Sequence, residues 1–229
     1  MDGLITLNQA QPEVQRKFMT GVYLRMFIAL IITTVSAYVT VSSQVLLNAI
    51  YGSWLIYGLI IGELVLVVTI SAAIRKLSPL VAMLLFVLYS VVNGMTLSSV
   101  FLLYSVRSIT RVFLATAVMF LAMSVYAIFS KSDLSKYSRY LGMGLIGILA
   151  VSVLNLIFKS SLIEWGVSIL GVGIFAGLTA YDTQKFMKIS IHDDGSENFQ
   201  KLAIFAALEL YLDFINIFIR LLRLFGKRK

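Results

Sequence analysis

Acidic side chains occur inside stretches of this chain that are otherwise hydrophobic enough to cross a membrane. These residues are Glu63, Asp182, Glu209 and Asp213. A carboxylate at the centre of a bilayer costs about 3 kcal/mol on insertion scales unless it faces protein or water, so such residues usually mark a pathway for ions or protons. Each acid is therefore a candidate functional residue. The alternative that remains open is a structural hydrogen bond to a neighbouring helix.

The last hydrophobic stretch, residues 202–222, carries two of these acids. Glu209, Asp213, Asn216 and Arg220 follow one another at spacings of four, three and four residues. Side chains at these spacings project from one side of a helix. The other sides carry Leu, Ile, Phe and Ala, so we expect this helix to lie inside a bundle, with its polar side turned toward a partner helix or a pore.

The composition is that of a membrane protein with several spans. Of the 229 residues, 59% are hydrophobic and 13% are charged, and about 20 residues are needed for each crossing. The formal net charge is +8, but the basic residues lie between hydrophobic stretches, which is typical of topology signals and not of a nucleic-acid surface. There is no cysteine, which excludes disulfides and thiolate metal sites. We expect one polytopic domain over residues 1–229.

Seven stretches are long and apolar enough to span a bilayer. We expect them at about residues 22–41, 51–74, 79–104, 112–129, 140–158, 162–187 and 202–222. Lys and Arg concentrate in the loops that share a side with the N-terminus, which predicts a cytoplasmic N-terminus with a short lead over about residues 1–20. The basic C-terminal end does not fit this rule, because seven crossings would place Arg220, Arg223 and residues 227–229 outside unless the last helix re-enters the membrane. We favour seven crossings, because the first helices usually set the topology.

No motif of a soluble enzyme is present, and we do not expect an enzyme. An intramembrane aspartyl protease is the one enzymatic alternative, because Asp182 and Asp213 lie on different helices and two nearby carboxyls can share a proton. However, Asp213 lies in the sequence LYLDF and not in the GxGD motif of those proteases. For Asp182 alone, an ion pair with Lys185 one turn away is an equally good interpretation.

Residues 175–185 (FAGLTAYDTQK) and 207–223 (ALELYLDFINIFIRLLR) resemble the C-terminal signature of the Bax inhibitor-1, or transmembrane Bax inhibitor motif, family. The likeness covers nearly the whole chain and is greatest to the bacterial inner-membrane branch. This resemblance implies an all-α fold of seven transmembrane helices, with the C-terminal helix in the centre and wrapped by the other six. It also implies a multi-pass protein of the bacterial inner membrane.

The resemblance further implies a pH-sensitive Ca²⁺ leak whose sensor is a pair of aspartates, which correspond here to Asp182 and Asp213. These two would bind Ca²⁺ transiently as the permeant ion, and no cofactor is expected. A basic residue at the inner end of the second span is thought to latch one of the pair, and Arg75 or Lys76 matches that position. Glu209 departs from the family pattern as an extra carboxylate, and with Asn216 it would extend the ion pathway.

Two other functions remain open from the sequence. One is a non-transporting interaction protein that binds a membrane partner, such as a membrane protease, or acts in a stress or cell-death response. The other is a proton-coupled transporter. A channel needs the carboxyl of Asp213 for flux, whereas a binding protein should tolerate asparagine there. Beyond such a partner, we expect contact with the lipid bilayer, Ca²⁺ and H⁺, and no nucleic acid.

Overall fold

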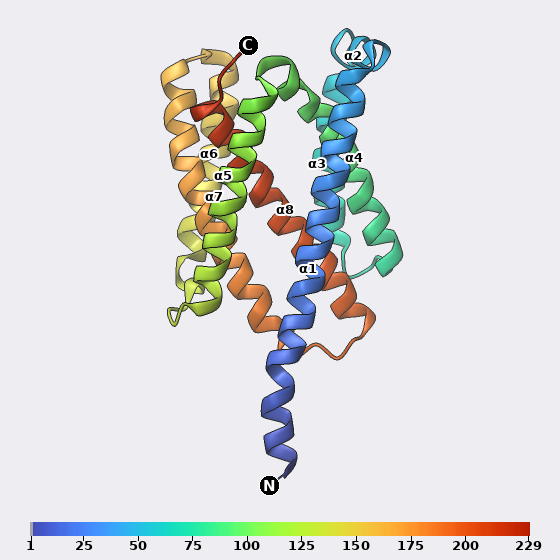
Figure 1. Cartoon of the computed structure of the whole chain (residues 1–229), viewed down its shortest axis with the longest axis vertical. Helices are drawn as coiled ribbons and strands as arrows, with labels where there is room; N and C mark the ends of the chain where they lie inside the picture. The colour runs from blue at the N-terminus through green and yellow to red at the C-terminus, as the bar shows by residue number, and fades with distance from the viewer. Residues whose placement is uncertain (1) are drawn as a thin grey trace. The chain divides into compact units, whose positions relative to one another are not determined.

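The computed structural model describes the chain from residue 2 to residue 229, and its side chains from residue 13 onward. It is all-α over this range (Figure 1). The elements in chain order are α1 (Asp2–Ser42), α2 (Gln44–Tyr51), α3 (Leu55–Ala73), α4 (Pro79–Leu103), α5 (Val106–Phe129), the 3₁₀ helix η1 (Leu134–Tyr137), α6 (Ser138–Phe158), α7 (Ser161–Ser190) and α8 (Glu197–Phe225).

Seven of the helices in the described part of the chain are long and apolar enough to cross a membrane. They are α3, α4, α5, α7, α8, the part of α1 from Glu13 onward, and α6 together with η1. A helix satisfies its own backbone hydrogen bonds, which is why apolar stretches of this length fold as helices in lipid. The predicted fold class of a seven-span helical membrane protein is confirmed.

Several helix starts differ from the prediction, including those of α1 at Asp2, α3 at Leu55 and α8 at Glu197. Serine caps explain two further differences. The short helix α2 (Gln44–Tyr51) lies largely between the first two expected spans, where no helix was predicted. It begins after Ser43, whose hydroxyl accepts a hydrogen bond from the backbone N–H of Leu46 at 3.4 Å. Helix α5 starts at Val106 and not near residue 112, because Ser105 caps it in the same way. Caps of this kind are polar, so a search for hydrophobic stretches misses them.

The helices form two compact units, each with its own packing. The first unit contains the residues up to Leu103 together with Ile189–Tyr211. Within it, α1 packs along α4, and α4 also packs against α3 (Figure 1). Gly94 of α4 makes the close approach to α1 feasible, because a methyl group there would collide with α1 at Ser36.

The second unit contains Tyr104–Lys188 and Leu212–Lys229. Helices α6 and α7 approach closely at Gly144, where an added side chain would meet that of Ile174. Helix α5 contacts α8 through aromatic rings. The ring of Phe214 lies 5.3 Å from that of Phe113 and 5.7 Å from that of Phe120, in edge-to-face geometry that favours such pairs.

Helix α8 is much more buried than the other candidate spans. In its most apolar window 67% of the residues are buried, against 6% to 33% in the other six spans of the described chain. Burial of this extent agrees with the expectation that α8 does not face lipid over most of its surface. Its predicted position in the centre of the six other helices stays a prediction.

Candidate functional site

Asp182 lies in α7 and is buried, with 7% of its surface exposed. Its Oδ1 atom lies 3.4 Å from the ammonium group of Lys185, one helical turn later. The ion pair that the sequence left open as one interpretation of Asp182 is therefore present. The same ammonium group lies 4.7 Å from the ring centre of Phe186, so the cation also has an aromatic neighbour in α7.

Asp213 lies in α8 and is even less exposed, at 4%. It belongs to the same compact unit as Asp182. The next residue, Phe214, packs against α5 through the ring contacts described above. Both aspartates predicted as the sensor are therefore buried residues with little access to water, in the parts of α7 and α8 that belong to one unit.

The polar side of α8 is divided between buried and half-buried residues. Half-buried positions recur along the helix every three or four residues, forming what we call the α8 stripe: Leu202, Phe205, Glu209, Leu212, Asn216 and Ile219. Glu209 and Asn216 belong to this stripe, whereas Asp213 and Arg220 are buried beside it. The side-chain amide of Asn216 donates to the carbonyl of Leu212 at 2.8 Å.

Arg220 is a buried cation that fastens α8 to α7. Its guanidinium group donates to the carbonyl of Val167 at 3.0 Å and lies 5.2 Å from the ring centre of Phe175. Gly171 provides the space, because a Cβ atom there would collide with the side chain of Arg220. The contact gives a reason for glycine in an apolar helix, where alanine is the better helix former.

A second group of polar side chains lies in the first unit. The carboxylate of Glu63 accepts hydrogen bonds from the hydroxyl of Thr96 and from the amide of Asn93. The amide oxygen of Asn93 accepts from the hydroxyl of Tyr211 at 2.9 Å, and that hydroxyl lies 2.7 Å from the hydroxyl of Thr33. These five residues, which we call the polar network, connect α3, α4, α8 and α1. Glu63 therefore forms the structural hydrogen bond to a neighbouring helix that the sequence left open as an alternative.

Four members of the polar network were not identified from the sequence. Thr33, Asn93, Thr96 and Tyr211 are uncharged, and such residues are common in membrane helices. Two of the contacts join residues 118 and 178 positions apart along the chain. The only signal available was Glu63, because an acid in a span needs a donor and Asn93 is a polar residue midway along the next span.

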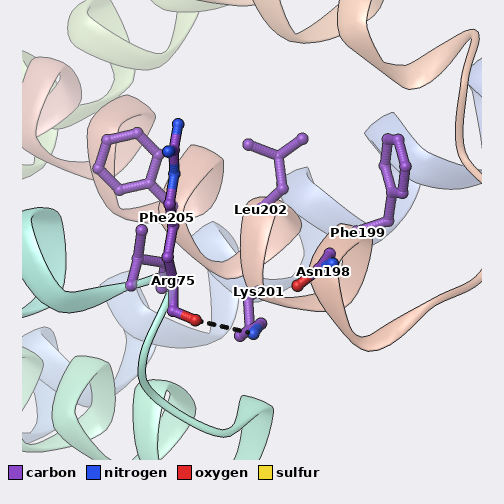
Figure 2. A pocket seen from close by; sticks show the side chains of 7 residues that line it. Arg75, Asn198, Phe199, Lys201, Leu202 and Phe205 are labelled. Carbon is purple, nitrogen blue, oxygen red and sulfur yellow. Dashed lines mark hydrogen bonds between the residues drawn. The ribbon is translucent and has the colours of Figure 1, made fainter.

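The predicted latch residue Arg75 follows the end of α3 and lines a hollow of about 350 Å³ near the start of α8. Figure 2 shows its side chain beside the ring of Phe205. Its backbone carbonyl accepts a hydrogen bond from the buried ammonium group of Lys201 at 3.3 Å, which fastens α8 to the end of α3 (Figure 2). Lys76, the other latch candidate, is the next residue in this turn.

Gln184 and Lys188 of α7 hold the connection between α5 and α6. The amide of Gln184 accepts from the backbone N–H of Leu134 at 2.8 Å and donates to the carbonyl of Ser132 at 2.9 Å. Lys188 forms an ion pair with Asp133. The hydrogen bond from Lys188 lowers the pKa of Asp133 to about 2. Gln184 belongs to the quoted stretch 175–185, so part of that signature has a structural role.

The two aspartates in the loop before α8 accept backbone hydrogen bonds within tight turns. Asp193 accepts from the backbone N–H of Gly195, and Asp194 accepts from that of Ser196, each at 2.9 Å. The hydrogen bond from Ser196 lowers the pKa of Asp194 below its ordinary value. Within the described residues there is no group of three His, Cys, Asp or Glu side chains that could hold a metal ion.

The fold and the buried acids define a multi-pass helical membrane protein with ionisable residues inside its spans. The chain matches the family model described as inhibitor of apoptosis-promoting Bax1 over residues 15–229. It is 43% identical over 215 residues to the inner membrane protein YbhL of Escherichia coli strain K12, covering 93% of this chain and 92% of YbhL. A protein of Borreliella burgdorferi is 42% identical over 230 residues, covering 99% of both chains. The chain therefore belongs to the Bax inhibitor family of membrane proteins, which confirms the resemblance identified from its C-terminal residues.

Proposed function

We propose that this protein is a pH-sensitive Ca²⁺ leak of the inner membrane, gated by a proton that Asp182 and Asp213 share. The observation that carries the proposal is the burial of both aspartates, 7% and 4% exposed, in the parts of α7 and α8 that belong to one compact unit. Ionisable residues at such depth are costly and usually serve an ion or proton pathway. The proposal takes the N-terminus to be cytoplasmic, as the distribution of Lys and Arg favours.

The gate depends on coupled titration of the two carboxyl groups. With one proton shared, Asp182 and Asp213 form a hydrogen bond and hold α7 and α8 together. When this proton is lost, two like charges repel in a medium of low dielectric constant. The repulsion separates the helices and frees carboxylate oxygens, which are the ligands that Ca²⁺ prefers. Glu209 and Asn216 of the α8 stripe would then extend the pathway along α8.

A latch at the end of α3 belongs to the same proposal. Arg75 or Lys76 would stabilise the closed state by pairing with one of the two aspartates. Glu209 offers a further partner for Arg75, because it follows Phe205 by one turn, about 6 Å along the α8 stripe, and the Arg75 side chain lies beside Phe205 (Figure 2). Replacing Arg75 by Gln should therefore raise Ca²⁺ flux at acidic pH, where the parent is closed.

The test is Ca²⁺ flux into liposomes that contain the purified protein, measured from pH 6 to pH 8. The parent is compared with Asp182→Asn and Asp213→Asn, each alone. The matched control is Asp194→Asn, which makes the same chemical change in the exposed loop before α8. We expect flux in the parent to rise with pH, because the shared proton is then lost, and both buried-site variants to lose this dependence while the control keeps it.

Two results would contradict the proposal. Flux no greater than that of empty liposomes at any pH would mean that the protein is not a leak, and would favour the role of a membrane interaction protein. Flux with an unchanged pH profile in both variants would mean that the two carboxyl groups do not gate it.

A further inference from the structure

A basic groove with a volume of about 980 Å³ lies in the second unit, between the first turns of α5 and the C-terminal residues. Four cationic residues line it: Arg107 and Arg111 of α5, and Lys227 and Arg228 after the end of α8. The remaining wall is mostly apolar and includes Met119 of α5 and Leu221 and Phe225 of α8.

Backbone hydrogen bonds fix the tail against the start of α5. The N–H of Lys227 donates to the hydroxyl of Ser108 at 2.9 Å, and the N–H of Ser105 donates to the carbonyl of Lys227 at 3.4 Å. Arg228 forms an isolated antiparallel bridge with Tyr104. These contacts hold residues that are more than 100 positions apart in the sequence next to one another. The four cationic residues therefore line the same groove.

No acidic side chain lies among the residues that line the groove. In the part of the chain that the structure describes, the ion pairs found between side chains involve none of the four cations of the groove. The N-terminus of α5 adds a partial positive charge at the same point. Four like charges repel one another, and a bound anion would offset this repulsion.

Several residues of the groove are also exceptions to the rule that Lys and Arg concentrate on the cytoplasmic side of a membrane protein. With a cytoplasmic N-terminus and seven crossings, Arg107, Arg111 and the tail lie on the outer side, where Lys and Arg are normally few. Their collection in a single groove suggests that they have a ligand. An apolar wall that continues from the cations into the span fits an acyl chain, and Phe225, which is 72% exposed, lies on that wall.

We propose that this groove binds an anionic phospholipid, with the phosphodiester against the four cations and an acyl chain along the apolar wall. Guanidinium and ammonium groups bind phosphate oxygens through charge-assisted hydrogen bonds, and basic pockets beside membrane helices suit lipid headgroups. The site is separate from the aspartate pair, so it stands or falls independently of the Ca²⁺ leak.

The test is lipid binding to the full-length purified protein, measured by native mass spectrometry. Three probes are titrated: phosphatidylglycerol, phosphatidylcholine with the same acyl chains, and inorganic phosphate. The parent is compared with the double variants Arg107→Gln/Arg111→Gln and Lys227→Gln/Arg228→Gln. The matched control is Lys131→Gln/Lys136→Gln, which removes two exposed cations elsewhere in the same unit.

We expect phosphatidylglycerol to bind the parent more tightly than either other probe, and each groove variant to weaken that binding about tenfold or more. The control variant should bind as the parent does. Equal affinity for the two lipids, or unchanged affinity in both groove variants, would overturn the proposal. Inorganic phosphate that binds as tightly as phosphatidylglycerol would also overturn it, because the site would then hold an anion and not a lipid. If a double variant fails to fold, Arg107→Gln and Lys227→Gln are compared singly.

Discussion

Replacing Tyr211 by Phe removes one hydroxyl group from the polar network and leaves the rest of the side chain in place. The residue is fully buried. Its hydroxyl donates to Asn93 at 2.9 Å and lies 2.7 Å from that of Thr33. The ring should remain packed, because its edge-to-face contacts with Phe86 and Tyr89 do not use the hydroxyl.

The expected cost follows from the two hydrogen bonds that are lost. Hydrogen bonds between membrane helices are worth about 0.6 kcal/mol on average and up to about 1.7 kcal/mol. Losing both, and leaving the amide oxygen of Asn93 without this donor, should lower the free energy of unfolding by about 1–3 kcal/mol. Equilibrium unfolding of the purified protein in mixed micelles with increasing sodium dodecyl sulfate measures this change.

Tyr140→Phe is the matched control, because the side chain of Tyr140 is 68% exposed. It should change the free energy of unfolding by less than about 0.5 kcal/mol. If Tyr211→Phe costs no more than Tyr140→Phe, the polar network does not stabilise the first unit and the reasoning from its geometry is wrong.

Two further predictions concern the second unit. Gly171→Ala should destabilise the protein by about 1–3 kcal/mol, because its methyl group collides with Arg220; Gly173→Ala, which meets open space, should be neutral or stabilising in the same unfolding assay. The ion pair of Asp133 with Lys188 holds the pKa of Asp133 at about 2, below its ordinary value of 3.8. A group with a lowered pKa in the folded state stabilises the protein above its unfolded pKa and loses this effect as the pH falls through the folded value. Parent and Asp133→Asn should therefore differ in stability by a constant amount above about pH 5, and the difference should shrink toward pH 2. An equal difference at every pH would show that the carboxylate charge is not responsible.

Hydropathy was sufficient to predict the seven spans, because lipid requires long helices whose backbone groups bond to one another. The ends of the helices were less predictable. Ser105 starts α5 earlier than its apolar residues indicate. The same applies to α8, which begins at Glu197, whereas its hydrophobic stretch was expected from residue 202.

The buried acids were identifiable from the sequence because a charge in a span is costly wherever it lies. The contacts around the buried polar residues could not be predicted in this way. The contact of Arg220 with Gly171 depends on how α7 and α8 pack, and the hydrogen bond of Lys227 with Ser108 joins residues 119 positions apart. Such pairs leave no periodic pattern in one sequence, so they were found only in the folded chain.

The central claim is that Asp182 and Asp213 act as one titrating pair, and a double-mutant cycle of Ca²⁺ flux tests it most directly. Flux at pH 6 and pH 8 is measured in liposomes for the parent, Asp182→Asn, Asp213→Asn and the double variant. A shared proton predicts strong coupling: once one carboxyl is replaced, replacing the other should change the pH dependence of flux little further. If the effect of the double variant on flux is the product of the two single effects, the two aspartates act independently. That result would contradict a shared proton, even if each aspartate alone is needed for flux.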